Sequence, residues 1–322
     1  MSLAILNVNR EPCGRYSVLE SKAGAQLQGT LNLAGEEIET KPMSEEDHIG
    51  RSEIAEDTAD PARLARLAAT LDRSGPPWVG DVLPPLGHWL CFQPDAPQSA
   101  LGEDGHPLRT GGGLLPEIDL PRRMWAGSRI RFLRDIPMGS PIVRRSTLAA
   151  SEPKTGRSGR MHFVTVLHEI GTGDGDPAIS EEQDLVYREA PAAGAAMERV
   201  AIPVEEIDDE KVRQVRPDPV MLFRYSALTF NSHRIHYDEP YATKVENYPG
   251  LVVQGPLLAT LLMDRLLHEA PGRRVASFSF RASAPLFSGE QARLGCAIDG
   301  NEVRLRAVGP YGLCMTAQAE CG

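Results

Sequence analysis

The sequence predicts an α+β fold in which one chain contains two similar units, each combining helix with an antiparallel sheet. Apolar residues recur at helical spacing in two main segments, and eight shorter segments alternate with the two-residue period of strands. This order of helix followed by strands occurs twice along 322 residues, a length that can bury a large core. Two such copies imply a pseudo-dimer within one chain, with the two sheets joined edge to edge.

The first unit is predicted to span residues 48–189. PARLARLAATLDR, residues 61–73, follows Asp60, begins with Pro61 and places its apolar residues on one helical face. A second, short apolar helix is expected at 83–92, followed by a long loop rich in glycine and proline. Four strands then form an antiparallel meander, at 128–133, 140–151, 160–170 and 181–189, with a glycine-containing hairpin turn at 154–159.

The pattern repeats in the second predicted unit, residues 218–322. A polar and partly helical segment at 221–245 leads to a strongly apolar helix at 249–269. FLRDIP at 132–137 and FRASAP at 280–285 share the same Phe-to-Pro spacing, and each is soon followed by glycine. Four further strands are expected at 273–282, 291–298, 302–308 and 313–320.

Charge is distributed unevenly along the chain. Residues 1–47 are predicted to be an N-terminal extension, and residues 190–217 a linker between the units. Residues 36–60 hold ten acidic side chains against two basic ones, which indicates a solvated linker. Residues 121–160 hold ten basic side chains against two acidic ones, and these either bind an anionic ligand or coat the solvent face of a sheet.

The composition narrows the class of protein. Hydrophobic residues make up 41% and charged residues 24%, and no apolar run is long enough to predict a membrane span. The five cysteines are scattered without a C-x-x-C pair, so neither a disulfide framework nor a cysteine zinc site is expected. We therefore expect a reducing compartment: the cytoplasm or, alternatively, the mitochondrial matrix. A net charge of −10 with 6% aromatic residues argues against a nucleic-acid partner.

Side chains with acid–base chemistry gather in TFNSHRIHYDEPYA, residues 229–242. The amide of Asn231 and the imidazole of His236 can address one water or one proton-bearing carbon, and imidazole is the natural acid or base near neutral pH. If the run is extended, Asn231 and His233 point to the same side, whereas in a helical run His233 and His236 are neighbours. Alternatively, His233, His236 and Asp238 cap helices and satisfy buried backbone groups.

A second functional feature is Gly255 followed by Pro256 at the start of the apolar helix. The free N–H groups of a helix N-terminus carry positive partial charge, and proline suits the first turn. A glycine there lets a carbonyl oxygen approach the backbone closely. Gly255 is therefore a candidate oxyanion donor, the alternative being a glycine kept for close packing of helix on sheet.

With these residues in place, the chain resembles the double hotdog fold and, within it, the MaoC-like hydratase family. That family carries Asp-x-Asn-Pro-x-His ahead of a helix entered through a glycine, and here Asn231 to His236 and Gly255 match those positions. A narrower group is similar in FRYSALTFNSHRIHYD, DLPRRMWAG and GRSGRMHFVTV: hydroxyacyl-thioester dehydratase type 2 and mesaconyl-C4-CoA (3-methylfumaryl-CoA) hydratase. The resemblance covers residues 48–322. Asn231 replaces the family's aspartate, and an amide cannot take a proton.

The resemblance implies a hydro-lyase that adds or removes water across the 2,3 double bond of an enoyl thioester. The C-terminal unit would be catalytic, and the N-terminal unit would shape the acyl pocket. Gly255 N–H would polarise the thioester carbonyl, Asn231 would orient the water and His236 would transfer the proton. His233 is the candidate second proton carrier, and neither a metal nor another cofactor is implied. The residues expected to contact substrate are Arg122, Arg123, Trp125 and Gln254.

Several alternatives stay open. Arg122 and Arg123 either hold a carboxylate or the phosphates of coenzyme A, or form a surface pair at a strand entry. The acyl group is expected to be a branched dicarboxylyl chain, the alternative being the (R)-3-hydroxyacyl thioesters of fatty acid synthesis, carried by coenzyme A or acyl carrier protein. A hotdog thioesterase would need a carboxylate that VVQGPLL lacks, whereas a non-catalytic acyl-thioester binding module would explain Asn231. The chain can work alone or as a homodimer.

Overall fold

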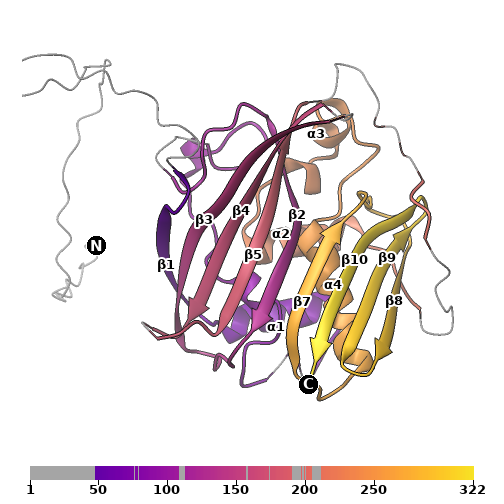
Figure 1. Ribbon diagram of the computed structural model, residues 1–322. Coiled ribbons are helices and arrows are strands. Elements are labelled where there is room, and N and C mark those ends of the chain that lie inside the picture. The colour runs from indigo at the N-terminus through magenta and orange to yellow at the C-terminus, as the bar shows by residue number, and fades with distance from the viewer. Residues whose placement is uncertain are drawn as a thin grey trace, which may run out of the picture. The chain divides into compact units, whose positions relative to one another are not determined.

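A continuous antiparallel sheet runs through the computed structural model (Figure 1). The structure describes residues 48–322 apart from gaps at 76, 79, 109–112, 157–158, 174, 191–196, 198, 200 and 205–211. Within the described residues the sheet has ten strands, in the order β1-β3-β4-β5-β2-β7-β10-β9-β8-β6. Their bounds are β1 Ser52–Thr58, β2 Arg122–Phe132, β3 Pro141–Gly156, β4 Gly159–Gly171, β5 Ile179–Arg188, β6 Arg213–Val215, β7 Val275–Ala282, β8 Ala292–Asp299, β9 Glu302–Gly309 and β10 Gly312–Cys321. The predicted extension, residues 1–47, lies outside the described residues.

The two predicted sheets meet at β2 and β7, which pair from Gly127 with Arg281 to Arg131 with Ser277. The edge-to-edge joint is therefore confirmed. The predicted four-strand meander is wrong in one respect, because only the last three strands of each set follow one another. The first strand of each set crosses over and pairs with the last, β2 with β5 and β7 with β10. This crossover brings β2 and β7 to the centre of the sheet.

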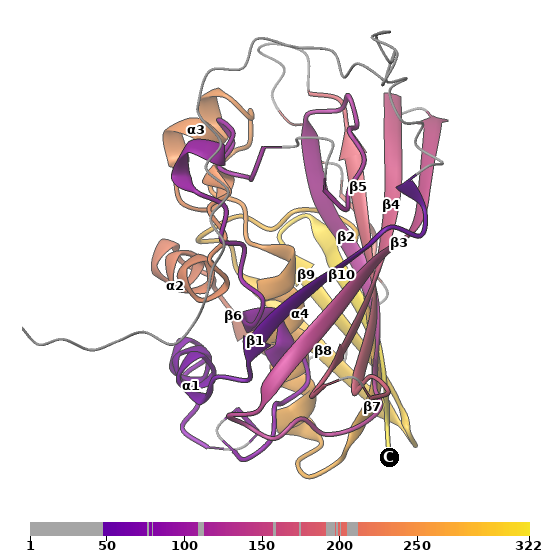
Figure 2. The same cartoon turned by 90° about the vertical axis from the view of Figure 1, so that its left-hand side faces the viewer.

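The helices cover one face of this sheet (Figure 2). They are α1 Pro61–Thr70, α2 Pro219–Thr229, α3 Glu239–Lys244 and α4 Gly255–Glu269. Helix α4 lies against the sheet, and its side chains from Leu257 to Leu266 are all buried, which explains why its sequence is apolar all round. Of the helices in the described ranges, none combines the length and apolar character needed to cross a membrane.

The two halves repeat one another at the level of single hydrogen bonds. Asp60 and Asp218 cap α1 and α2, and a proline follows each of them. Gly139 and Gly289, which follow the two matched FLRDIP and FRASAP segments, both have φ near +80° and donate their N–H to the residue just before the cap. The internal repeat predicted from the sequence is thus a repeat of structure.

The halves differ at the position in the first half that corresponds to α4, where a short helix was predicted. Residues 83–92 form only a short 3-10 helix, Gly87–Leu90, so the predicted helix in the first half is wrong as to length. Leu86 and Phe92 on either side have positive φ, and prolines lie near both ends of the segment. The chain then continues as the predicted loop, with a short 3-10 turn at Gln98–Ala100. Among the described residues of the first half, no helix is thus as long as α4.

Two segments predicted to be linkers contain edge strands. Residues 52–58, within the acidic segment 36–60, form β1 and pair with β3, and residues 213–215 of the predicted 190–217 linker form β6 and pair with β8. Edge strands tolerate charge and need few apolar residues, so their sequences do not stand out from a solvated linker. The remaining acidic residues before position 48 lie outside the described residues.

One buried carboxylate fastens α4 to the first half. The Asp264 side chain is 2% exposed and accepts hydrogen bonds from Arg73, at 2.8 and 2.9 Å, from Trp78 Nε1, at 2.8 Å, and from Arg213. Burial alone would raise the pKa of Asp264, but these three donors together hold it below its ordinary value. Asp264 therefore joins α4, β6 and the segment that follows α1.

Candidate active site

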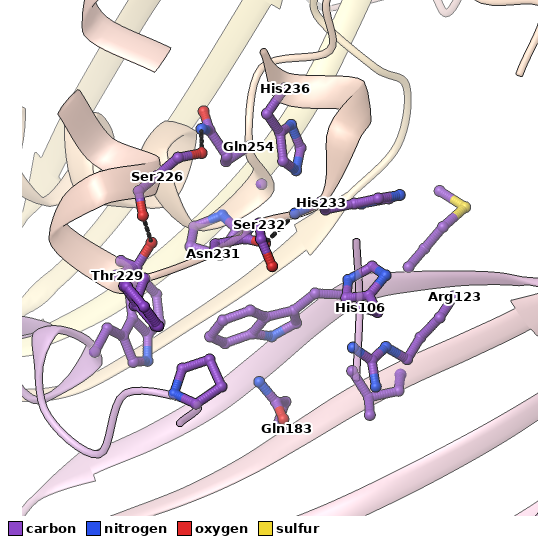
Figure 3. A pocket seen from close by; sticks show the side chains of 18 of the residues that line it. His106, Arg123, Gln183, Ser226, Thr229, Asn231, Ser232, His233, His236 and Gln254 are labelled. Atoms are coloured by element: carbon purple, nitrogen blue, oxygen red, sulfur yellow. Dashed lines mark hydrogen bonds between the residues drawn. The ribbon is translucent and has the colours of Figure 1, made fainter. Parts of the chain in front are cut away.

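A cavity of about 1860 Å³ lies between the two halves, and Figure 3 shows part of its lining. The second half contributes the ends of α2 and α4 and the loop from Asn231 to His236. The first half contributes the 3-10 turn at His88 and Trp89, side chains of β2, β3, β4 and β5, and the loop that contains His106. The short 3-10 helix of the first half, Gly87–Leu90, thus lines a cavity that extends into that half.

The end of α2 sets the position of the polar run. Phe230 closes the helix in the left-handed conformation, with φ +50°, and Asn231 N–H returns to Ser226 O at 2.8 Å. The chain then turns into a 3-10 helix, Arg234–His236, with His233 just before it. The rings of His233 and His236 are edge to face, 5.3 Å apart between centroids, so they are neighbours, one of the two arrangements that the sequence left open.

His236 is placed as a neutral base. Its Nδ1 lies 2.7 Å from Val252 O, an acceptor only, so Nδ1 carries the hydrogen and Nε2 keeps its lone pair. The residue is 7% exposed, and burial lowers the pKa of His236 to about 4, against the opposing effect of the bond to Val252. The ring is therefore uncharged near neutral pH and can accept a proton at Nε2.

Asn231 and Gly255 flank this base. The Oδ1 atom of Asn231 accepts the N–H of His233 at 3.0 Å, which leaves its Nδ2 group to donate to a water oxygen. Gly255 is the first residue of α4, so its N–H has no acceptor within the helix. A Cβ at position 255 would meet only Trp125 O, at 3.7 Å, and Gly255 lines the cavity.

The four residues expected to contact substrate differ in their freedom to do so. Arg122 is paired with Glu246 at 2.5 Å and stacked on Tyr248. Arg123, in contrast, lines the cavity and makes no ion pair or hydrogen bond with the described residues. Trp125 donates to Ser128 Oγ and presents its ring to the cavity. Gln254 is fully buried and binds Leu222 O and Ser226 Oγ through Nε2, while its Oε1 has no partner among the described residues.

The sequence analysis did not single out Asp104 and His106, which the structure places beside His233. In the structure Asp104, His106 and His233 place one potential ligand atom each within 4.8 Å of one another, the one such group of three found among the described residues. Burial, aided by the nearby His106 and His236, lowers the pKa of His233 to about 2. The signal lay in GEDGH, a glycine-containing turn that carries an acid and an imidazole.

The pKa of His236 leads to a pH prediction. A histidine that acts as a base must be neutral, so kcat/KM should stay level as pH falls from about 7 to about 5 and drop only near pH 4. Asn231→Asp should raise this pKa, since a carboxylate favours the imidazolium, and so move the drop to higher pH. The pH profile of kcat/KM tests both, with the exposed change Asn301→Asp as control. A wild-type drop near pH 6.5 would contradict the prediction.

Known proteins similar to this chain define its family. The family model for hydroxyacyl-thioester dehydratase type 2 matches residues 86–288. The mesaconyl-C(4)-CoA hydratase of Chloroflexus aurantiacus is 48% identical over 276 residues, which are 85% of this chain and 96% of that protein. The mitochondrial hydroxyacyl-thioester dehydratase type 2 of Schizosaccharomyces pombe is 29% identical over 246 residues, 68% of this chain and 79% of that one.

Solved structures support the fold. A MaoC-like dehydratase from Phytophthora capsici matches with a TM-score of 0.62 at 14% identity, covering 87% of this chain and 98% of that one. A Mycobacterium tuberculosis protein with a double hotdog fold matches with a TM-score of 0.50 at 12% identity, covering 85% and 96%. The chain therefore belongs to the hydroxyacyl-thioester dehydratase type 2 family and is a MaoC-like, double hotdog hydro-lyase of enoyl thioesters, similar to mesaconyl-C4-CoA hydratase.

Proposed function

We propose that this enzyme hydrates a branched enoyl-CoA that carries a free carboxylate beside its double bond, as mesaconyl-C4-CoA does. The observation that carries the proposal is Arg123, a cation that lines the reaction cavity and has no ion-pair partner in the described part of the chain. A guanidinium recognises a carboxylate through two parallel hydrogen bonds. The 48% identity to a protein named for that substrate supports the same choice.

The neighbouring residues account for the addition of water. His236 Nε2 takes a proton from a water whose oxygen is held by the Asn231 amide. As that oxygen bonds to C3, the π electrons move through C2 to the thioester oxygen, which accepts the Gly255 N–H. The enolate then takes a proton at C2. Asn231 cannot supply that proton, because an amide does not ionise, so a single base would have to return it.

Arg123→Gln tests the substrate assignment. We expect kcat/KM for mesaconyl-C4-CoA to fall about 10- to 100-fold while crotonyl-CoA, which lacks the carboxylate, changes little, since a charge-assisted hydrogen bond contributes about 1.5–3 kcal/mol. Arg131→Gln is the matched control, because Arg131 lies on the same strand but is exposed and outside the cavity. Equal losses on both esters, or none, would contradict recognition of a carboxylate by Arg123.

A second candidate is a (R)-3-hydroxyacyl-thioester dehydratase of fatty acid synthesis. The observation that favours it is the cavity of about 1860 Å³, larger than a branched C5 acyl group requires. The wall contributed by the first half, however, includes Arg144, Glu181 and Gln183, and the burial of Arg144 lowers its pKa. Polar groups of this kind disfavour a long alkyl tail. Measuring the hydration of decenoyl-CoA beside that of mesaconyl-C4-CoA in the same assay decides between a long alkyl substrate and a branched dicarboxylyl one.

We propose coenzyme A as the carrier, because of the named relative, and acyl carrier protein esters are the comparison in the assay. Cys91, Cys314 and Cys321 are buried free thiols, which supports work in a reducing compartment, for which we propose the cytoplasm. We propose a homodimer, with the two sheet edges at β1 and β6 as candidate surfaces, and light-scattering mass measurement tests it.

A further inference from the structure

A turn from the first half lies directly on the catalytic loop of the second half. Arg234 N–H donates to Asp104 O at 2.9 Å, Arg234 Nη1 donates to Glu103 O at 3.0 Å, and Ser232 Oγ donates to Gly105 O. Gly105 has φ +88°, and a Cβ at that position would lie 1.9 Å from Ser232 O, so only glycine permits this approach. The turn is therefore built against the loop that carries Asn231 and His236.

The turn carries an imidazole held by a carboxylate. Asp104 Oδ2 lies 2.9 Å from His106 Nδ1, and Asp104 Oδ1 accepts the backbone N–H of His106 at 2.9 Å. Burial would raise the pKa of Asp104, but the bonds from His106 and the nearby imidazoles lower it well below its ordinary value, so the carboxylate is ionised. An ionised carboxylate at Nδ1 stabilises the protonated form of an imidazole, in which the second ring hydrogen is on Nε2.

The His106 ring belongs to a row of three imidazoles. Its ring packs against that of His233, with 4.1 Å between centroids and a tilt of 41°, and the His233 ring meets that of His236 edge to face at 5.3 Å. All three rings line the reaction cavity (Figure 3). The low pKa of His233 means that the middle ring is neutral, with one nitrogen free to accept a proton and one to donate.

We propose that His106, oriented by Asp104, is the acid that protonates C2, a step that the Asn231 amide cannot perform. In hydration, His236 takes one proton from water as the C3–O bond forms and the C2=C3 π pair becomes the enolate. The enolate pair then takes the Nε2 proton of the His106 imidazolium to form the C2–H bond. This leaves His106 neutral and His236 protonated, and one proton passes from His236 through His233 to His106. The net change is addition of one water, with no electrons gained or lost.

The charged groups around His106 bear on this role in opposite directions. Asp104 favours the imidazolium, whereas Arg123, which lines the same small hollow as Asp104 and His106, disfavours it. Binding of a substrate carboxylate at Arg123 would neutralise that opposing charge. The proton donor would thus be strengthened by the substrate that we propose, so this inference rests in part on the proposed function.

The test compares His106→Gln and Asp104→Asn with His268→Gln, an exposed histidine near the end of α4. We expect His106→Gln to lower kcat about 10²- to 10⁴-fold while the affinity for unreactive butyryl-CoA and Tm stay near wild type. The alkaline limb of the kcat/KM profile, where the acid loses its proton, should disappear in His106→Gln and move to lower pH in Asp104→Asn. His106→Ala should regain turnover when imidazole is added.

Other outcomes would overturn the inference in distinct ways. Unchanged kcat and an unchanged alkaline limb in His106→Gln, with a wild type that hydrates, would leave the proposed function standing and remove His106 from it. Loss of butyryl-CoA binding and Tm together, without imidazole rescue, would make the turn structural only. Activity abolished by EDTA and restored by Zn²⁺ would make Asp104, His106 and His233 metal ligands instead. A wild type inert toward every ester would remove the proposed function itself.

Discussion

Replacing His236 with glutamine is expected to leave a protein that folds and binds its thioester but turns it over about 10²- to 10⁴-fold more slowly. Glutamine can still donate a hydrogen bond toward Val252 O, but it offers no basic nitrogen in the place of Nε2. The loss should therefore fall on kcat, measured by the absorbance of the conjugated thioester. Affinity for butyryl-CoA, measured by calorimetry, should change little.

His268→Gln serves as the control for His236→Gln, since His268 is exposed and lies outside the cavity. A His236→Gln enzyme that keeps kcat within about threefold of wild type would remove His236 as the base, given the usual size of acid–base catalysis.

Asp264→Asn is expected to produce the largest loss of stability of any single change considered, about 3–5 kcal/mol of the free energy of unfolding. The amide cannot balance the charges of Arg73 and Arg213. The side chain at position 264 is 2% exposed in the wild type, so little water can replace the lost contacts there. Chemical denaturation at neutral pH measures the loss, with Asp299→Asn on the exposed end of β8 as the matched control.

The same carboxylate gives the sign of a pH effect. Because the folded-state pKa of Asp264 is lowered, its contribution to stability is present above the unfolded pKa of about 3.9 and is lost as pH falls through the lower folded value. The gap in stability between wild type and Asp264→Asn should thus be full at pH 7 and shrink below about pH 4. A gap that does not depend on pH would show that packing, not charge, holds α4 there.

Local patterns made much of the fold predictable from sequence. The apolar face of residues 61–70, the largely apolar α4 and the alternating strands each indicate burial directly, so their types are confirmed, although α4 begins at Gly255 and not at the predicted residue 249. The order in which the strands pair was not predictable. The sequence of a single strand does not indicate that β2 pairs with β5 and β7 and not with β3, which follows it in the chain. The short edge strands β1 and β6 contain polar residues and few apolar ones. This composition suits the edge of a sheet and also resembles that of a polar linker.

Part of the candidate site could likewise be predicted from the sequence, and part of it could not. Asn231, His233 and His236 lie within six residues, so one turn of chain brings them together and the sequence alone points to them. Asp104 and His106 reach the same place from the other half, across a contact between Ser232 and Gly105 that spans 127 positions. The pairing of Arg122 with Glu246 likewise depends on tertiary structure, and only that structure separates Arg122 from Arg123.

Hydration of mesaconyl-C4-CoA by the wild-type enzyme in D₂O tests the central claim most directly, with the product read by NMR and mass spectrometry. We predict loss of the double bond, a new hydroxyl at C3 and a single deuterium at C2, with the thioester intact. Release of free coenzyme A without a C3 hydroxyl would indicate thioester hydrolysis instead. Binding of the ester without any reaction would contradict hydro-lyase chemistry on this substrate.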